Sequence, residues 1–217
     1  MIVEIATDAN GPYFKIIGAQ PQISVRVEFL PRKKIGLKSD CLARAIGYKK
    51  GEVLRVIDAT AGLCRDAFHI ACLGCQVVAI ENNLQIFNVV SYFVNLLPTK
   101  YNLTLVHQEA KKFLLSLSEN DRPDVIYLDP MFPEKNKSAK PGKESELLKL
   151  LAPIASIEEE KNFLNSALQV AKKRVVIKRP LYAPAIKSSP QIVFKGKSVR
   201  YDVYITGSKH KVSHMPQ

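Results

Sequence analysis

The chain has 217 residues, of which 47% are hydrophobic and 24% charged, so it can bury a full core without disulfides or metals. These values exclude a disordered, collagen-like or coiled-coil chain, and no apolar run reaches the roughly 18 residues of a membrane helix. Lys and Arg total 32 against 20 Asp and Glu, and the net charge of +12 favours a polyanionic partner. The N-terminal residues show no secretory signal pattern, so we expect a cytoplasmic protein.

The first fifty residues are rich in short β-forming runs separated by turn formers. Strands are predicted over 2–5, 13–17 and 23–29. Ser39 or Asp40 is expected to cap a short helix that ends at Gly47. We therefore predict a small β-rich appendage over residues 1–50 and a main domain over residues 51–217.

From residue 52 onward, near-continuous apolar runs alternate with helical patterns. Five strands are predicted over 54–60, 75–81, 103–109, 124–130 and 174–180. Helices are predicted over about 65–73, 84–97, 109–118 and 157–172, with a polar loop over 134–143. The segments 191–195 and 199–206 then form an antiparallel hairpin. This pattern predicts an α/β fold, a Rossmann-like sheet of five parallel strands plus a C-terminal antiparallel hairpin.

The chain has four cysteines, Cys41, Cys64, Cys72 and Cys75, of which the last two form a C-x-x-C pair. No second cysteine pair or histidine cluster follows at zinc spacing. We therefore interpret all four as reduced, mostly buried thiols and expect no bound metal.

Ligands of open α/β sheets bind at the carboxyl ends of the strands. After the first parallel strand comes a loop of mostly small residues between Asp58 and Asp66, with Gly62 inside it. Because this loop lacks the G-x-G-x-x-G pattern, it is a weak match to a dinucleotide site, and a tight turn is the simpler alternative. Glu81, after the second strand, is placed to accept hydrogen bonds from a ribose diol. The loop and Glu81 together indicate a nucleoside-containing cofactor.

The most specific signal follows the fourth parallel strand, where the chain reads Asp129-Pro130-Met131-Phe132-Pro133. The proline turns the backbone sharply at the sheet edge, directly after a carboxylate. Phe132 adds an aromatic ring, and an acceptor beside a stacking ring suits a flat amino-bearing group such as a nucleobase. A plain strand-ending turn is the alternative.

These residues resemble class I S-adenosylmethionine-dependent methyltransferases, and D-P-x-F is similar to the D/N-P-P-Y/F motif of enzymes that methylate exocyclic amino groups. The segments DATAGLCRDAF, LGC, YLDPMFPEKNKSA and VVIKRPLYAP together resemble the RsmJ family, bacterial 16S ribosomal RNA guanine-N2 methyltransferases. The resemblance covers most of residues 25–206. This chain departs from the family pattern at Cys64, where the family has glycine, at Asn82, where it has arginine, and at Glu109-Ala110, where it has two serines.

The resemblance implies transfer of a methyl group from S-adenosylmethionine to N2 of a guanosine in 16S ribosomal RNA, free or in the small ribosomal subunit. Arg65 and Asp66 would meet the methionine end of the cofactor, and Asp129 would reach both the cofactor and the target amine. The cofactor-binding residues it implies are Asp58, Gly62, Arg65, Asp66, Glu81, Asn82, Glu109, Ala110 and Asp129. The catalytic residues it implies are Asp129, Pro130 and Phe132.

Basic residues near these motifs are expected to extend an RNA-binding surface, and a merely solvated side chain is the alternative for each single lysine. They are Arg32, Lys33, Lys34, Lys135, Lys137, Lys140, Lys143, Lys178 and Arg179. Two other function classes stay open: a methyltransferase acting on a small molecule or a protein amide, and a non-catalytic RNA-binding module. The net charge disfavours the first, and the retained Asp129 and Phe132 disfavour the second.

Overall fold

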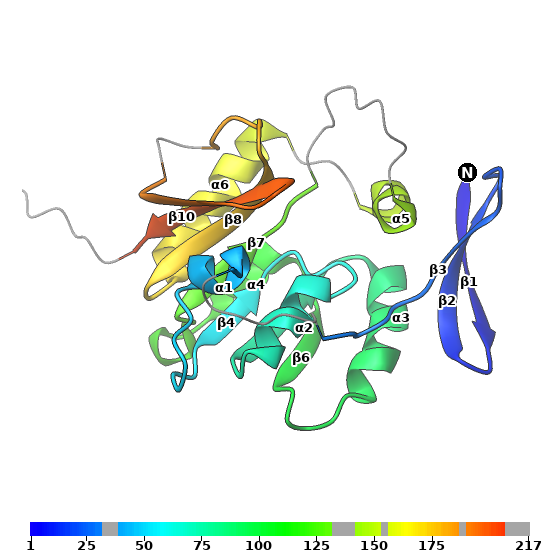
Figure 1. Ribbon diagram of the computed structural model, residues 1–217, viewed down its shortest axis with the longest axis horizontal. Coiled ribbons are helices and arrows are strands. Elements are labelled where there is room, and N and C mark those ends of the chain that lie inside the picture. Colours follow the sequence, from blue (N-terminus) through cyan, green and yellow to red (C-terminus); the bar gives the residue numbers. More distant parts are fainter. Residues whose placement is uncertain (32–38, 132–141, 153–155, 187–189, 207–217) are drawn as a thin grey trace, which may run out of the picture.

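The computed structural model describes residues 1–31, 39–131, 142–152, 156–186 and 190–206. Its main sheet has seven strands in the order β6-β5-β4-β7-β8-β10-β9 (Figure 1). The strands are β4 (Arg55–Asp58), β5 (Gln76–Glu81), β6 (Leu103–His107), β7 (Val125–Leu128), β8 (Arg174–Pro180), β9 (Ile192–Lys195) and β10 (Val199–Ile205). Strands β4 to β8 are parallel, whereas β10 pairs antiparallel with both β8 and β9. The predicted five parallel strands and C-terminal hairpin are confirmed.

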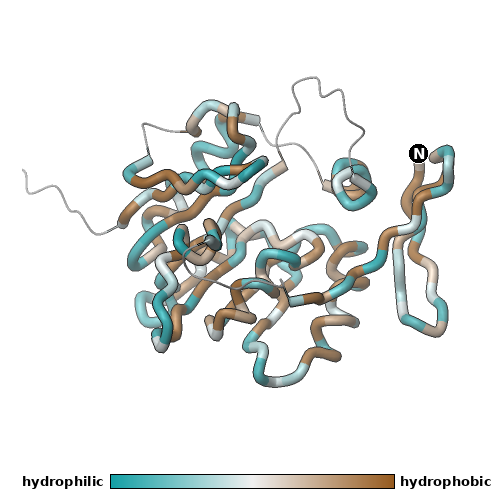
Figure 2. Tube along the Cα trace, in the orientation of Figure 1, coloured by the Kyte–Doolittle hydropathy of each residue, from teal (hydrophilic) through white to brown (hydrophobic). Residues whose placement is uncertain are grey.

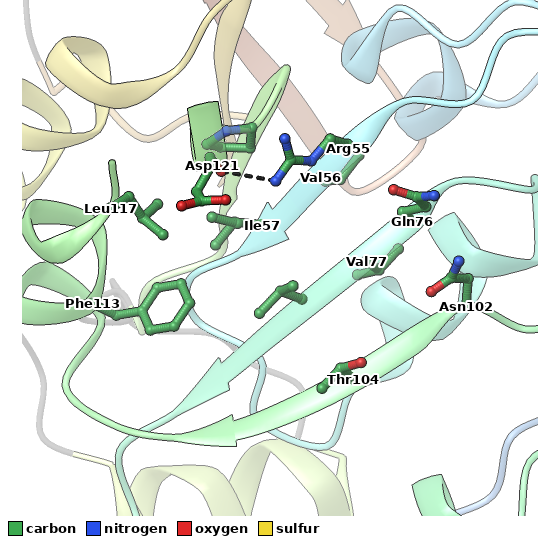
Figure 3. Close-up of a pocket in the computed structure, with 12 residues that line it drawn as sticks. Arg55, Val56, Ile57, Gln76, Val77, Asn102, Thr104, Phe113, Leu117 and Asp121 are labelled. Atoms are coloured by element: carbon green, nitrogen blue, oxygen red, sulfur yellow. Dashed lines mark hydrogen bonds between the residues drawn. The ribbon is translucent and has the colours of Figure 1, made fainter. Parts of the chain in front are cut away.

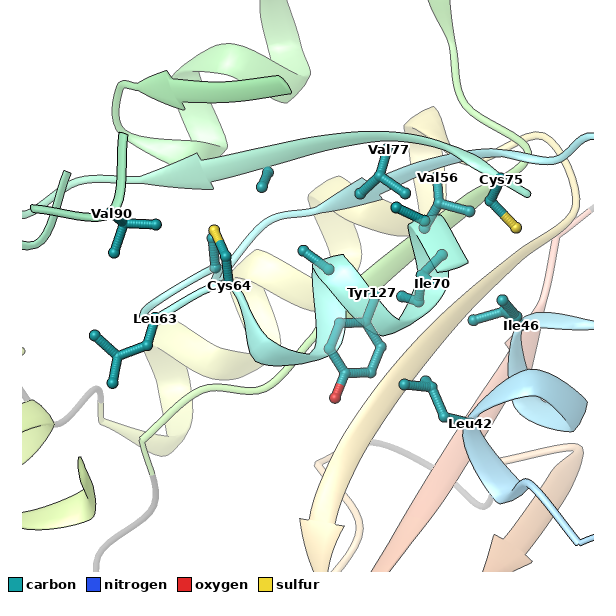
Figure 4. Close-up of a cluster of buried hydrophobic side chains, with 14 of the residues drawn as sticks. Leu42, Ile46, Val56, Leu63, Cys64, Ile70, Cys75, Val77, Val90 and Tyr127 are labelled. Carbon is teal, nitrogen blue, oxygen red and sulfur yellow. The ribbon is translucent and has the colours of Figure 1, made fainter. Parts of the chain in front are cut away.

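Helices cover both faces of this sheet because its central strands are apolar on both faces. Helices α1 (Cys41–Ile46), α2 (Arg65–Cys72) and α3 (Leu84–Asn95) contribute to one hydrophobic cluster, and α4 (Ala110–Ser116) and α6 (Ile157–Val170) to the other. Along β7, Tyr127 joins the first cluster while Ile126 and Leu128 join the second. Figure 2 shows the apolar strands enclosed between the helices, and Figure 4 shows the first cluster. No helix in the described ranges is long and apolar enough to cross a membrane.

The N-terminal residues form a separate antiparallel sheet of β1 (Ile2–Asp8), β2 (Gly11–Ile17) and β3 (Ile23–Val25). It lies beside α3 and α5 (Lys143–Leu151), away from the main sheet (Figure 1). The third strand ends earlier than predicted. Helix α1, by contrast, packs on β8, β9 and β10 of the main sheet. The β-rich start of the appendage is therefore present, and the division of the chain at residue 50 stays a prediction.

Helix boundaries follow local capping chemistry. Asp40 caps α1, since its Oδ1 accepts hydrogen bonds from the amides of Leu42 and Ala43, each at 3.0 Å. Gly47 ends that helix at φ +73°, a conformation that glycine adopts without steric cost. Helix α5 and the short 3₁₀ helix η1 (Glu119–Asp121) lie outside the helices predicted from the sequence.

The order of the strands fixes where a ligand can bind. From β4 the chain proceeds to β5 and β6 on one side, then crosses back to β7 and β8 on the other. Such a reversal opens a crevice at the carboxyl ends of the strands around the switch point. The loops after β4 and β7 therefore meet at this edge of the sheet.

Candidate active site

A cavity of about 540 Å³ lies at the carboxyl ends of β4, β7 and β8. It is within the range of about 300–1,000 Å³ that small-molecule sites occupy. Its wall combines the loop after β4, the Asp-Pro turn after β7, helix α5, the end of β8 and the start of β10. Six of the residues predicted for the site line this one cavity. They are Asp58, Gly62, Arg65, Asp66, Asp129 and Pro130.

A charged network connects the walls of the cavity. The Lys178 ammonium lies 2.9 Å from Asp66 Oδ2 and 2.8 Å from Asp129 Oδ2. The Tyr127 hydroxyl donates a hydrogen bond of 2.6 Å to the same Asp66 oxygen. Burial opposes the charged form of Lys178, but the two carboxylates outweigh it and raise the pKa of this lysine. Lys178 therefore stays protonated and holds the two aspartates together.

Asp129 keeps one oxygen available for a ligand. Burial raises the pKa of its carboxyl above the ordinary value, and the positive charge of Lys178 partly offsets that rise. Within the described part of the chain, hydrogen bonds engage its Oδ2 and its backbone amide but not its Oδ1. The backbone amide donates to Thr60 Oγ1 at 2.6 Å, which fixes the turn after β7 to the loop after β4.

Asp58 lies beneath these groups and is almost completely buried. Its Oδ1 accepts a hydrogen bond of 3.1 Å from the Thr60 amide. Burial, aided by the negative charges of Asp66 and Asp129, raises the pKa of Asp58 to about 8. Its carboxyl is therefore mostly protonated at neutral pH.

The structure corrects the prediction that Lys178 and Arg179 extend an RNA-binding surface. Lys178 faces the cavity and pairs with two aspartates, whereas Arg179 is buried and lies 3.5 Å from Glu160 of α6. The reason is that β8 continues through Pro180 with helices on both faces, so these two basic side chains lie inside the protein. A signal was present in the sequence, because two carboxylates expected at one sheet edge, Asp66 and Asp129, favour a nearby cation.

Arg65 lies in the wall of the cavity at the start of α2, as predicted. Its guanidinium already has two partners, the Glu28 carbonyl at 2.6 Å from Nη1 and the Glu144 carboxylate at Nη2. Glu144 belongs to α5, and this helix also brings Ser145 and Leu148 into the lining. Sequence reasoning missed these residues because it predicted no helix there.

Glu81 connects the loop after β4 to the end of β5. Its Oε2 accepts a hydrogen bond of 2.9 Å from the Gly62 amide, and its Oε1 accepts one of 2.7 Å from the Asn83 amide. Burial raises the pKa of this carboxyl. The side chain of Asn82 is exposed, and its neighbour Asn83 caps α3. Glu81 and Asn82 are not among the described residues that line the main cavity.

Glu109 and Ala110 line a second cavity, of about 460 Å³, which shares Pro130 with the first. Glu109 precedes α4, and its carboxylate pairs with Lys112 at 3.1 Å. The residues predicted for the adenine end and those predicted for the methionine end therefore lie in two cavities that meet at Pro130.

A third cavity, of about 340 Å³, lies toward the amino ends of the strands (Figure 3). Arg55, Gln76 and Asn102 line it together with Phe113 of α4. It contains none of the predicted site residues and lies away from the carboxyl edge.

Several predicted residues lie outside the described residues. They are Phe132 and the basic residues Arg32, Lys33, Lys34, Lys135, Lys137 and Lys140. Lys143 starts α5 and is exposed.

Cys64 immediately precedes α2 and has φ +56°, the left-handed conformation that favours glycine. Its side chain is completely buried within the first hydrophobic cluster (Figure 4). The loop therefore holds the Cys64 side chain at a position whose left-handed backbone conformation is strained for any residue with a Cβ. All four cysteines are free thiols, with Cys64 and Cys75 buried.

This geometry makes a testable prediction about stability. Cys64→Ala retains the strained Cβ and loses the sulfur, whereas Cys64→Gly loses both the sulfur and the strain. We expect the glycine variant to be more stable than the alanine variant by up to about 1 kcal/mol, because about 1–2 kcal/mol of left-handed strain is relieved while glycine costs roughly 0.5–1 kcal/mol in chain entropy. Urea unfolding of both variants measures the difference, and an alanine variant at least as stable as the glycine variant would contradict it.

Comparisons with known proteins identify the family of this chain. The profile of the family described as "Putative SAM-dependent methyltransferase" matches residues 22–206. The ribosomal RNA small subunit methyltransferase J of Thioalkalivibrio sulfidiphilus is 41% identical over 93% of this chain and 79% of its own length. The protein of that name from Cellvibrio japonicus is 36% identical over 92% of this chain and 82% of its length. The crystal structure of a SAM-dependent methyltransferase from Neisseria gonorrhoeae has a TM-score of 0.70 and 27% identity, covering 96% of this chain and 84% of that one.

The sheet order, the loop after β4 and the Asp-Pro turn after β7 define a Rossmann-like methyltransferase that uses S-adenosylmethionine. The chain belongs to the SAM-dependent methyltransferase family of that profile and, within it, to the ribosomal RNA small subunit methyltransferase J proteins. The predicted fold class, family and cofactor are confirmed.

The residues present fit this cofactor chemically. Asp66 and Asp129 offer carboxylates to an ammonium group, and the start of α2 offers backbone amides to a carboxylate. Glu81 offers acceptors to a ribose diol. These assignments of individual residues stay predictions.

The role of Glu81 can be tested by substitution. We expect Glu81→Ala to weaken S-adenosylmethionine binding by about 1–3 kcal/mol, since it removes charged acceptors and frees the Gly62 amide. Calorimetry on the folded variant measures this loss. Asn83→Ala is the matched control, because it removes the α3 cap next to Glu81 but keeps the carboxylate and its backbone donors. The control should lose about 1 kcal/mol of stability and bind the cofactor normally. Equal affinities for all three proteins would exclude Glu81 from the site.

Proposed function

We propose that this protein transfers a methyl group from S-adenosylmethionine to the exocyclic N2 of a guanosine in 16S ribosomal RNA of the small subunit. The observation that carries the proposal is Asp129, which lines the cavity with one oxygen bound to Lys178 and the other without a hydrogen bond to any described residue. The relatives' names support the RNA substrate, and the net charge of +12 suits it. Ribosomal RNA as substrate places the enzyme in the cytoplasm.

Bound S-adenosylmethionine supplies an electrophilic methyl group on a sulfonium sulfur. The N2 lone pair of guanine is delocalised into the ring, so the protein must orient the amine to make it a nucleophile. In the proposed mechanism, Asp129 Oδ1 and the Pro130 carbonyl accept the two amino hydrogens and turn the lone pair toward the methyl group. As the carbon–nitrogen bond forms and the carbon–sulfur bond breaks, with S-adenosylhomocysteine as the leaving group, the Asp129 carboxylate would stabilise the positive charge that develops on nitrogen, which then loses one proton to solvent. Lys178 positions this carboxylate through its other oxygen.

Phe132 is proposed to stack on the target base, and the basic residues after it are proposed to contact RNA phosphates. Arg65 would reach the methionine carboxylate by exchanging its Glu144 partner for it. Glu109 and Ala110 would line the adenine, across Pro130 from the reacting methyl group. Asn82 would lie beside the ribose.

The decisive experiment is methyl transfer from labelled cofactor to unmodified 16S RNA transcribed in vitro, and to small subunits reconstituted from it. Nucleoside mapping should then find the label on N2 of guanosine. Label only on a small molecule or protein amide would favour the first alternative class. Failure to bind S-adenosylmethionine would favour a non-catalytic RNA-binding module.

A further inference from the structure

Tyr182 lies two residues beyond the end of β8, and 96% of its surface is exposed, more than that of any other large hydrophobic side chain in the described ranges. A ring left in water gains none of the free energy that aromatic side chains contribute when buried. Its neighbour Pro180, at the end of β8, lines the main cavity. The exposed ring is therefore carried by a segment that leaves the wall of the cavity.

The turn that carries Tyr182 is held from inside the protein. The buried Arg200 donates from Nη1 to the carbonyls of Pro180 at 3.1 Å and Leu181 at 2.7 Å. Its other two nitrogens pair with the fully buried Asp202 at 2.8 and 3.0 Å. The Ala183 amide closes the turn on the Pro180 carbonyl at 3.1 Å. A buried charged pair thus fixes the backbone on either side of a ring that makes no contribution to the core.

Lys197 lies at the same end of the sheet as Tyr182. Pro180 and Val199 are the last paired residues of the β8–β10 ladder, and Tyr182 and Lys197 each lie two residues beyond that pair. Lys197 is exposed at the tip of the β9–β10 hairpin, which the Gly196 amide closes on the Val199 carbonyl at 2.8 Å. Ser198 and Val199 line the cavity, as Pro180 does. An exposed aromatic residue and an exposed lysine therefore lie on the two segments that leave the same end of the β8–β10 ladder, next to residues that line the cavity.

We propose that Tyr182 and Lys197 form an RNA-docking rim, in which the ring stacks on an unpaired base beside the target guanosine and the ammonium binds a neighbouring phosphate. Base–aromatic stacking does not require a particular base, and a lysine recognises phosphate as a point charge. The proposal rests on the proposed function, because it assumes that the target base reaches the cavity from an RNA strand.

The test compares variants on unmodified 16S RNA and on reconstituted small subunits. Tyr182→Ala should raise the KM for RNA about tenfold, within the range measured for loss of one stacked base, and leave kcat and cofactor affinity unchanged. Tyr182→Phe keeps the ring and should stay within about twofold of the unmodified protein. Leu96→Ala removes another exposed apolar side chain, at the far end of α3, and should have no effect.

Lys197→Gln should flatten the dependence of RNA affinity on salt, by a slope of about 0.7–0.9 for one phosphate contact. Lys50→Gln is its control, because Lys50 is exposed and precedes β4 at the opposite edge of the sheet. If the salt slope of Lys197→Gln were unchanged, Lys197 would not contact an RNA phosphate and would not belong to the RNA-docking rim.

A binding assay can test the ring independently of activity. The chain has no tryptophan, so Tyr182→Trp introduces a single reporter whose emission should be quenched when RNA stacks on it. Unchanged emission at saturating RNA, together with a normal KM for Tyr182→Ala, would overturn the proposal. Absence of methyl transfer by the unmodified protein would instead refute the proposed function. The fluorescence titration would still show whether RNA stacks on the side chain at position 182.

Discussion

Asp129→Ala is expected to lower the rate of methyl transfer by about 10²–10³-fold, the loss found when one preorganised electrostatic group is removed from an active site. The reason is that Asp129 Oδ1 has no hydrogen-bond partner among the described residues, and we propose that it holds the target amine. Single-turnover measurements with saturating cofactor and RNA give the rate of the chemical step. Cofactor affinity, measured separately, should fall much less than the rate.

Asp129→Asn is the matched variant, because it keeps an acceptor oxygen of the same shape but loses the negative charge. Its rate should lie between those of the unmodified protein and the alanine variant. If Asp129→Ala turned over ribosomal substrate at the normal rate, the proposed mechanism would fail even though the family assignment would stand.

The main sheet was predictable because each of its strands carries its own signal. β4, β5, β7 and β8 are apolar on both faces, and such runs between helices indicate a covered parallel sheet. The sequence also indicated which loops meet, since the polar residues after each strand gather at one edge. Asp58, Asp66 and Asp129 could therefore be assigned to one site before their contacts were known.

Tertiary contacts determine the positions of several site residues that the sequence alone could not predict. Helix α5 follows a polar loop and has one fully buried residue, Leu147, so its apolar pattern was weak, yet it supplies Glu144 to Arg65. Lys178 lies in a basic stretch that suggested a surface, and only the pairing of β8 with β7 brings it to Asp66 and Asp129. Pairs of residues far apart in sequence, such as these, carry no local signal.

Replacing Lys178 with methionine should lower both stability and activity, and both losses should depend on pH. The substitution leaves two carboxylates, Asp66 and Asp129, without their cation. Because the network is partly open to the cavity, we expect a loss of about 2–3 kcal/mol at pH 8, below the 3–5 kcal/mol typical of breaking a fully buried pair. Lys178→Arg keeps the charge and should lose less.

The sign of the pH dependence follows from Asp129. Burial already raises the pKa of this carboxyl above its value in the unfolded chain, and removing the neighbouring cation raises it further. The folded variant then binds a proton more tightly than the unfolded chain. Its stability therefore falls as pH rises from the pKa of Asp129 in the unfolded chain to its pKa in the folded variant, and recovers toward acid pH.

Because the proposed mechanism needs ionised Asp129, the acid limb of the rate profile should also move to higher pH. Asp66→Asn in the same background removes one of the two carboxylate charges and should restore part of the stability. Urea unfolding and single-turnover rates from pH 5 to 9 test this, and a stability loss in Lys178→Met that did not change with pH would show that the lysine acts by packing alone.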